Sequence, residues 1–238
     1  MNQQRYVSYK SQGFSTVELI IAISITSIVI AASYTIFNSQ HKLFMLHEEA
    51  VVMQQNLRAG IYHLEREIRM AGCDPSGDAN AGIMTAHDSL MRFTHDILGV
   101  SLEKEYSDNI INDQNFPDNL AEDILYRLFD IDNDGDKDLV RNKTLVAENI
   151  DALDFVYLDS TGSDLDTDSD GEIPESSIPF IRTVQISLVA RTGKADARYV
   201  NNSVYRNKQG DIILEAQEDH FRRRCLTTEV RCRNFIFH

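Results

Sequence analysis

The sequence predicts an α+β fold in which one long N-terminal α-helix packs on an antiparallel β-sheet. Three observations predict it: an uncharged apolar run near the N-terminus, a helical repeat of apolar residues after it, and alternating apolar residues further on. The chain has 238 residues, 42% of them hydrophobic, which suffices for a sizeable core. Its 37 acidic and 23 basic residues give a formal net charge of -14, and this charge repels a phosphate backbone. A nucleic-acid partner is therefore not expected.

The apolar run extends from Leu19 to Phe37 and contains no charged residue. As a helix it would be about 28 Å long, enough to cross the hydrocarbon core of a bilayer. Because Arg5 and Lys10 precede it, the positive-inside rule predicts a cytoplasmic N-terminus and an exported C-terminal part. A cleavable secretory signal is the alternative interpretation. Against it, helical periodicity continues past the run, and Glu18 places a charge at its very start.

Residues 13–19, Gly-Phe-Ser-Thr-Val-Glu-Leu, together with the apolar run resemble the cleavage and methylation motif of type IV prepilins and pseudopilins. In that family a membrane aspartyl peptidase, the prepilin peptidase, cuts after the glycine and methylates the new N-terminal phenylalanine. The resemblance implies a cut between Gly13 and Phe14, which leaves the apolar helix on the mature chain. It also implies that Glu18 acts between subunits of a filament.

The charge of Glu18 has its own physical requirement. A carboxylate in a membrane is unfavourable by a few kcal/mol unless a cation accompanies it. After cleavage the amine of Phe14 would lie four residues from Glu18 on the same helical face, and a neighbouring subunit's amine could meet Glu18 equally well. We therefore expect Glu18 to select the packing register by penalising any arrangement that leaves it unpaired. The alternative is a charge that merely reaches the membrane interface.

The helix is expected to continue well beyond the apolar run. Apolar residues at spacings of three and four mark one face of an amphipathic helix. These residues are Leu46, Ala50, Met53, Leu57, Ile61, Leu64 and Ile68. No proline lies between Phe14 and Ala71, so a single helix is expected to end near Gly72 and Pro75. The apolar face is interpreted as packing on the protein's own sheet, with a coiled coil to a partner as the alternative.

After Gly82 the pattern changes to a period of two, which predicts one antiparallel sheet. The expected strands are residues 90–93, 124–129, 152–158, 181–190 and 226–237. The acidic loop 159–177 is expected to be exposed. The predicted organisation is a leader at residues 1–13, a transmembrane and assembly helix at 14–37, its amphipathic periplasmic continuation at 38–72, and a β-rich globular domain at 73–238.

Four further segments extend the resemblance to PilW-type minor pilins, which are similar in plan to the J-type pseudopilins of type II secretion. They are residues 65–72, 150–159, 181–191 and 231–234. The resemblance implies a structural subunit that primes or caps a type IV pilus. Its implied partners are other minor pilins, the major pilin, the prepilin peptidase and the inner-membrane assembly platform. Its implied location is the inner membrane, as a single-pass protein with a periplasmic C-terminal domain, and then the pilus at the cell surface.

An acidic loop has the spacing of a calcium site. Its candidate ligands are Asp130, Asp132, Asp134, Asp136 and Asp138. Oxygen ligands recur at every second residue, and Gly135 occupies the sixth position, where a calcium loop turns sharply. In an EF-hand-like frame the first three would bind through side chains, the fourth through its carbonyl, and the fifth directly or through water. Arg141 stands where the bidentate acid would be. A solvated acidic turn is the alternative to calcium binding.

A second acidic segment, residues 164–175, fits the same frame poorly. A frame that starts at Asp166 lacks an acid at its twelfth position, and one that starts at Asp164 lacks a glycine at its sixth. An exposed acidic loop is therefore the favoured interpretation there. The state of the three cysteines stays open, because an oxidising periplasm permits one disulfide. On a single strand, however, Cys225 and Cys232 would lie about 23 Å apart and could not be bridged.

The sequence gives no support to catalysis, since the motifs GxSxG, HExxH and GxxxxGK[ST] are absent. We therefore expect a structural protein and not an enzyme. Two alternatives stay open: a type II secretion pseudopilin of the J type, and a calcium-dependent adhesive module displayed on a filament.

Overall fold

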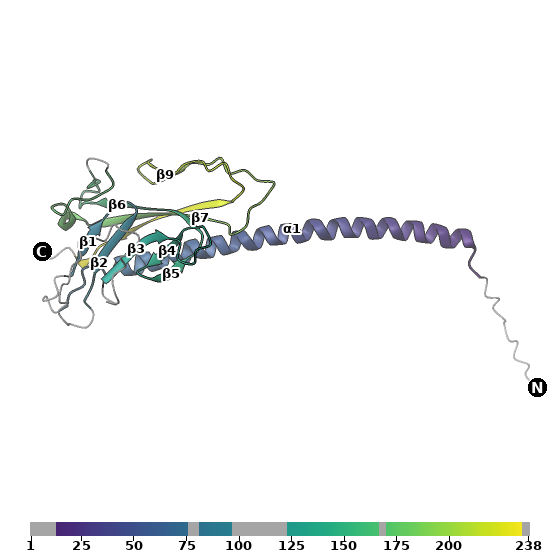
Figure 1. Ribbon diagram of the computed structural model, residues 1–238, viewed down its shortest axis with the longest axis horizontal. Coiled ribbons are helices and arrows are strands. Elements are labelled where there is room, and N and C mark those ends of the chain that lie inside the picture. The colour runs from purple at the N-terminus through teal and green to yellow at the C-terminus, as the bar shows by residue number, and fades with distance from the viewer. Residues whose placement is uncertain (1–12, 76–80, 97–122, 167–169, 235–238) are drawn as a thin grey trace, which may run out of the picture. The chain divides into compact units, whose positions relative to one another are not determined.

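The computed structural model describes residues 13–75, 81–96, 123–166 and 170–234 (Figure 1). It confirms the predicted α+β class, with a long N-terminal helix and antiparallel sheets. The chain divides into two compact units, Met1–His47 and Glu48–His238. Helix α1 (Thr16–Ile68) contributes its first part to one unit and its last part to the other.

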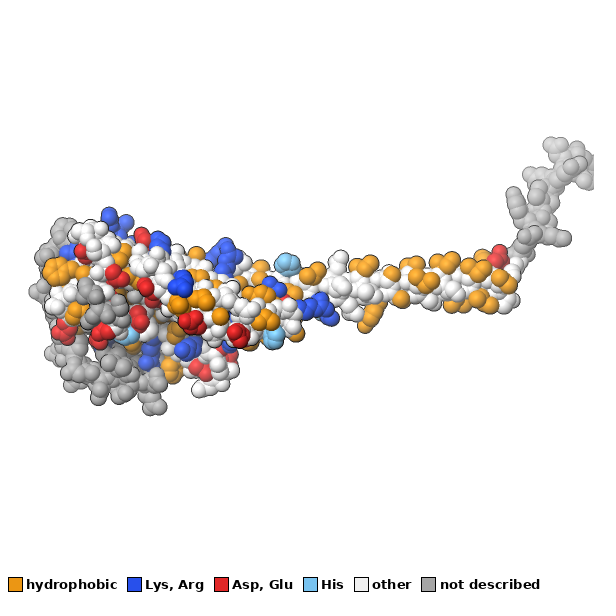
Figure 2. Space-filling model, turned by 90° about the horizontal axis from the view of Figure 1, so that it is seen from above, with side chains coloured by type: hydrophobic (Ala, Val, Ile, Leu, Met, Phe, Trp, Pro, Cys, Tyr) orange, Lys and Arg blue, Asp and Glu red, His pale blue; other side chains and the backbone are white. Residues whose placement is uncertain are grey.

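The first unit consists of the N-terminal part of α1. Apolar side chains cover the surface of this segment (Figure 2), and Ile28, for example, is 70% exposed. α1 contains an 18-residue stretch that is long and apolar enough to cross a membrane, and none of that stretch is buried. The unit therefore presents apolar surface with no cover from its own chain in the described structure.

Five hydroxyl groups in this N-terminal part of α1 bond to the helix itself. Each donates to the carbonyl four residues earlier, over distances of 2.7–3.0 Å. The donors are Ser24, Thr26, Ser27, Thr35 and Ser39. Since water is absent from a bilayer core, such internal bonds are what allow hydroxyl side chains to reside there.

In the second unit, α1 supplies one face to the core. Met53, Leu57, Ile61, Leu64 and Ile68 are buried and Ala50 is half-buried, as is Leu46, which belongs to the first unit. The apolar face predicted from the sequence is confirmed, and its residues from Met53 onward join the core of the protein's own sheets. α1 ends at Ile68, and turns lead to Gly72, where a φ of 72° favours glycine.

Ten strands and one short 3₁₀ helix follow in the described ranges (Figure 1). They are β1 (Ile83–Ala86), β2 (Leu90–Thr94), β3 (Asp123–Phe129), β4 (Asp138–Arg141), β5 (Thr144–Ala147), β6 (Ile150–Leu158), η1 (Ile178–Phe180), β7 (Thr183–Arg191), β8 (Tyr205–Arg206), β9 (Ile212–Leu214) and β10 (Arg223–Arg231). Four of the five expected strands agree with β2, β3, β6 and β7 to within two residues. The fifth, 226–237, is β10, which starts earlier and ends at Arg231; residues 235–237 lie outside the described ranges.

The strands form more than the one sheet that the sequence predicts. A five-stranded sheet has the order β1-β2-β3-β4-β5, a three-stranded sheet has the order β10-β7-β6, and β8 pairs with β9. All of these pairings are antiparallel. The chain passes from the first sheet to the second at Asn149, whose φ of 59° lies in the left-handed region and redirects the backbone between β5 and β6.

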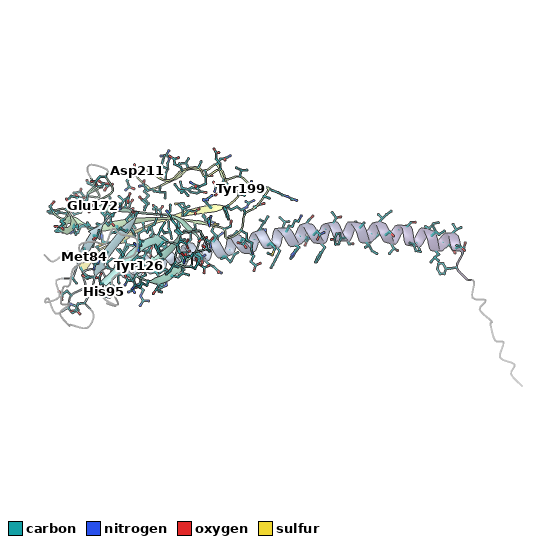
Figure 3. The ribbon with its side chains drawn as sticks, viewed as in Figure 1. Met84, His95, Tyr126, Glu172, Tyr199 and Asp211 are labelled. Carbon is teal, nitrogen blue, oxygen red and sulfur yellow. The ribbon has the colours of Figure 1, made fainter. Side chains whose placement is uncertain are left out.

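Both larger sheets pack against the same part of α1. A Cβ built on Gly60 would lie 2.9 Å from Leu188 Cδ2 of β7 and 3.1 Å from Leu139 Cδ2 of β4. On β3, Tyr126 is fully buried, and its hydroxyl donates a 2.7 Å hydrogen bond to Glu67 of α1 (Figure 3). The absence of a side chain at Gly60 therefore allows the helix to approach both sheets closely.

Candidate functional site

The predicted processing residues lie just ahead of α1. Gly13, Phe14 and Ser15 are outside the helix and exposed, and Phe14 is 87% exposed. Apart from its chain neighbours, no described residue lies within 4 Å of a Cβ built on Gly13. The bond between Gly13 and Phe14 is thus accessible to an enzyme.

Glu18 lies in the first turn of α1 and has a partner that the charge argument did not anticipate. Its Oε2 accepts a hydrogen bond of 2.9 Å from the backbone N–H of Ser15, and the Ser15 hydroxyl accepts one of 3.3 Å from the N–H of Val17. Ser15 is therefore the N-cap of α1, and the pair resembles a capping box, in which Ser and Glu stand three residues apart. This spacing is readable in the sequence as Ser-Thr-Val-Glu.

The acidic loop between β3 and β4 gathers three of its five predicted ligands. Carboxylate oxygens of Asp130, Asp132 and Asp134 all lie within 4.8 Å of one another. The backbone N–H of Gly135 donates to Asp130 Oδ2 at 3.1 Å, and that of Asp136 donates to Asp134 Oδ1 at 3.1 Å. The loop turns through Asn133 and Gly135, with φ values of 61° and 94°. The described structure thus folds the loop so that three acids converge.

The remaining predicted ligands are held by other parts of the fold. The carboxylate of Asp136 pairs with Arg191 at the end of β7, with 2.9 Å between Arg191 Nη2 and Asp136 Oδ2. Asp138 begins β4 and is 1% exposed. Its Oδ1 accepts a 3.0 Å hydrogen bond from the N–H of Asn149, whereas its Oδ2 is buried without a hydrogen bond in the described chain. Arg141, at the twelfth position, pairs with Glu67 at 2.8 Å.

The pKa values in this loop follow from burial and from the neighbouring charges. Burial, and then the negative charges of Asp136, Asp132 and Asp134, raise the pKa of Asp138 to about 6. Burial also raises the pKa of Asp136, although the Arg191 guanidinium opposes the shift. The pKa of Asp134 is lowered, mainly by the hydrogen bond from the Asp136 backbone. Burial thus dominates the pKa shifts of Asp136 and Asp138, whereas hydrogen bonding dominates that of Asp134.

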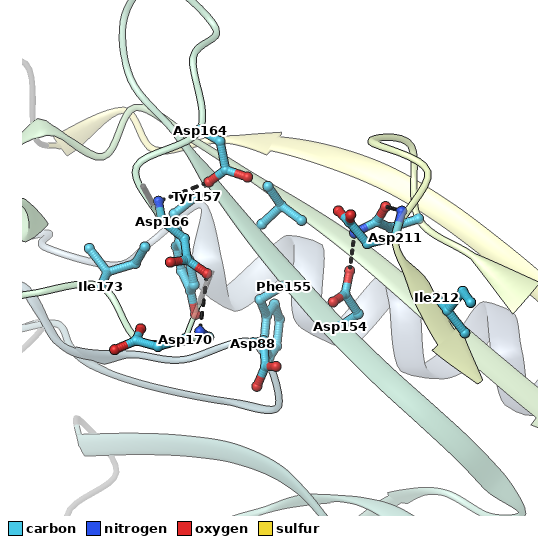
Figure 4. Close-up of a pocket in the computed structure, with 13 residues that line it drawn as sticks. Asp88, Asp154, Phe155, Tyr157, Asp164, Asp166, Asp170, Ile173, Asp211 and Ile212 are labelled. Atoms are coloured by element: carbon cyan, nitrogen blue, oxygen red, sulfur yellow. Dashed lines mark hydrogen bonds between the residues drawn. The ribbon is translucent and has the colours of Figure 1, made fainter. Parts of the chain in front are cut away.

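The second acidic segment contributes to a cavity of about 320 Å³. Six aspartates line it, together with Phe155, Tyr157 and Ile173 (Figure 4). The aspartates are Asp88, Asp154, Asp164, Asp166, Asp170 and Asp211. The segment was expected to be merely an exposed acidic loop, and spacing along the chain did not indicate that distant acids join it.

Among the aspartates that line this cavity, Asp154 has a strongly raised pKa. Burial raises its pKa to about 6, the charges of Asp88 and Asp211 add to the shift, and a hydrogen bond from Asn207 opposes it. The loop at its edge repeats two hydrogen bonds of the first acidic loop. Gly171 N–H donates to Asp166 Oδ2 at 3.1 Å, and Glu172 N–H donates to Asp170 Oδ1 at 3.0 Å. Asp168 lies outside the described residues.

The three cysteines are free thiols in the structure. Cys225 lies within β10 and Cys232 directly follows that strand, as expected for two thiols that a single strand holds apart. Cys232 is fully buried, and burial raises its pKa to about 12. Cys73 is half-buried beyond the end of α1. The buried thiol of Cys232 is thus poorly suited to redox chemistry.

Comparisons with known proteins found likeness in structure. No family model matches the chain, and no curated protein matches it. Among solved structures, a type IV-like pilin from Thermus thermophilus is similar, with 14% sequence identity and a TM-score of 0.41 over 76% of this chain and 97% of that chain. At this identity and TM-score the likeness lends no weight to a functional assignment.

Proposed function

We propose that the chain is a minor pilin, a structural subunit that primes or caps a type IV pilus. In this proposal the precursor inserts in the inner membrane, is cut after Gly13 and methylated at Phe14, and is then incorporated into the filament. One observation carries the proposal: an exposed Gly13–Phe14 bond stands directly before an apolar, uncovered helix whose first turn contains Glu18.

The uncovered apolar surface supports an assembly role. Exposed apolar surface on the N-terminal part of α1 is unfavourable in water, at about 25 cal/mol for each Å². Lipid and a bundle of like helices both remove this cost, and the proposed life cycle provides them in succession. The second unit, with its own core, is suited to remain outside the membrane.

The position of Glu18 supports a precise role for the cut. In the uncut chain its carboxylate accepts the Ser15 backbone N–H. Cleavage after Gly13 would create a positively charged amine at Phe14, one residue from that N–H. The carboxylate would then serve its own new N-terminus or that of a neighbouring subunit, which is the register role that the sequence suggests.

Expression in a piliated host with an active prepilin peptidase tests the proposal. Mass spectrometry of the membrane-extracted protein is expected to find a mature chain that starts at a methylated Phe14, and sheared filaments are expected to contain it in low copy. Gly13→Leu should block the cut, whereas the neighbouring Gln12→Leu should leave it unchanged. A product that starts elsewhere, or a soluble product without the apolar segment, contradicts the proposal. Recovery only with a type II secretion pseudopilus would assign the chain to that machinery instead.

A further inference from the structure

We propose that the loop between β3 and β4 binds one calcium ion through the carboxylates of Asp130, Asp132 and Asp134. This inference goes beyond the assembly role, because it concerns a site in the second unit and does not require a filament. It begins from the convergence of three acids whose oxygens lie within 4.8 Å of one another. Oxygens that bind one calcium ion at 2.3–2.6 Å are at most about 5 Å apart, so the observed spread fits a single ion.

A convergence of acids is not in itself a site, since exposed acidic turns are common. The independent observation is Asp138, which is 1% exposed and whose Oδ2 has no hydrogen-bond donor among the described residues. Asp138 begins β4 directly after the loop and occupies the ninth position of the frame that starts at Asp130. Asp130 adds a second buried oxygen, Oδ1, that lacks a donor in the described chain.

Two buried carboxylate oxygens without donors are costly unless a positive charge meets them. Two nearby arginines form their ion pairs with other acids. Arg191 bonds to Asp136 and also lies 3.7 Å from Asp151, while Arg141 pairs with Glu67. Across the described ranges none of Asp130, Asp132 and Asp134 forms an ion pair. A divalent cation bound by Asp130, Asp132 and Asp134 would bring a positive charge to this loop.

The fold also limits how tightly the ion is held. Because Arg191 engages the side chain of Asp136, this residue has its carbonyl left for the ion, as the seventh residue of such loops does. Arg141 occupies the twelfth position, where such loops carry a bidentate acid, and its side chain donates a hydrogen bond to Glu67 of α1. With that ligand missing, we expect a dissociation constant of about 10⁻⁴–10⁻³ M, the range of extracellular calcium modules.

The loop at the acidic cavity provides a control within the same chain. Asp166 and Asp170 accept the same pair of backbone hydrogen bonds as Asp130 and Asp134. Its ninth residue, however, is Pro174, whereas the ninth residue of the first loop is the buried Asp138. The inference therefore assigns calcium to the first loop.

The test uses the full chain in detergent micelles, stripped with a chelator and titrated with calcium by calorimetry in 150 mM salt. We expect one ion per chain, and magnesium at the same concentrations should bind at least tenfold more weakly. Asp132→Asn/Asp134→Asn should weaken calcium binding at least tenfold, and Asp138→Asn should weaken it about tenfold. The matched variant Asp166→Asn/Asp170→Asn should bind as the wild type does.

A second readout separates loss of the site from loss of the fold. Calcium at 5 mM is expected to raise the melting temperature of the wild type by about 2–6 °C, and this rise should vanish in Asp132→Asn/Asp134→Asn. In chelator, both chains should melt at the same temperature. If the double variant melts early in chelator, the single exposed change Asp132→Asn carries the test. Any of four results would overturn the inference. These are no heat of binding with calcium up to 10 mM, magnesium binding as tight as calcium binding, undiminished calcium binding by the first-loop variants, and weaker calcium binding by Asp166→Asn/Asp170→Asn.

Discussion

The carboxylate of Glu67 on α1 accepts a hydrogen bond from the buried hydroxyl of Tyr126 on β3, with 2.7 Å between the two oxygens. The same carboxylate accepts a hydrogen bond of 2.8 Å from Arg141 Nε on β4. Glu67 thus connects α1 to two neighbouring strands, β3 and β4, by hydrogen bonds. Burial, and the adjacent charge of Glu67, raise the pKa of Tyr126 far above its ordinary value, so its hydroxyl stays protonated and keeps donating.

Removal of Glu67 should therefore cost more than removal of the hydroxyl it accepts. Glu67→Ala is expected to lower the free energy of unfolding by about 2 kcal/mol, because the Tyr126 hydroxyl is left buried without an acceptor. Tyr126→Phe should cost about 1 kcal/mol, since Glu67 still accepts from Arg141. Denaturant melts of the full chain in detergent measure both changes. Equal losses in the two variants would show that the hydroxyl is satisfied elsewhere.

Gly60 should tolerate no branched side chain. Its built Cβ lies 2.9 Å from Leu188 and 3.1 Å from Leu139, and both leucines are fully buried. Gly60→Val is expected to cost about 2–3 kcal/mol by overpacking. Gly60→Ala should cost less, because a gain of about 1 kcal/mol in helix propensity offsets part of the crowding. The adjacent exposed residue gives the control: Ala59→Val should cost about 0.5 kcal/mol, from propensity alone. A loss at position 60 no larger than this control would contradict the close packing.

The raised pKa of Asp154 in the acidic cavity should make the stability of the protein depend on pH. Its pKa is raised from about 3.8 in the unfolded chain to about 6 in the folded one, so the folded state holds the proton more tightly. This contribution favours the fold below pH 4 and is lost as the pH rises from about 4 to 6. At pH 7, the free energy of unfolding of Asp154→Asn should therefore exceed that of the wild type by on the order of 1 kcal/mol after solvent screening. At pH 4, the two proteins should be equally stable. A difference that stays constant across this range would refute the assignment.

Substitutions at Glu18 can distinguish its role in capping α1 from the role of its negative charge. A glutamine in the same position keeps an oxygen for the Ser15 N–H but carries no charge, as capping boxes with Gln show. If the charge selects the packing register, Glu18→Gln and Glu18→Ala should both reduce incorporation into sheared filaments, by about tenfold or more for a pairing worth about 1.4 kcal/mol. Thr16→Ser, which leaves both groups in place, is the control. Wild-type incorporation of Glu18→Gln would leave helix capping as the role of this residue.

The fold was largely predictable because its signals are local. Long alternating segments such as 152–158 and 181–190 predict β6 and β7. The spacing of the apolar residues from Met53 to Ile68 predicts the buried face of α1. The sequence did not predict five short strands of two to four residues each, namely β1, β4, β5, β8 and β9. The turn that connects β4 and β5 uses Asn142 at a φ of 52° without the Asn-Gly pair that marks such hairpins.

The candidate sites were predictable only as far as spacing along the chain decides them. The first acidic loop and its glycine are visible in the sequence. That Arg191, 55 residues further on, takes the side chain of Asp136 is a tertiary contact that spacing does not encode. The same holds for the cavity, where Asp88, Asp154 and Asp211 come from three separate segments. The cap that Ser15 and Glu18 form was visible and was missed, because the acid was interpreted through its charge alone.

The inward hydrogen bonds of Ser24, Thr26, Ser27, Thr35 and Ser39 bear on how the N-terminal helix changes surroundings. Because these hydroxyls already bond within the helix, a transfer from lipid to a bundle of other helices would exchange one set of dispersion contacts for another of similar strength. No hydroxyl of this group needs to find a new donor or acceptor on the way. In the proposed assembly these five side chains would therefore not oppose the transfer, which would depend on helix packing and on the acid at position 18.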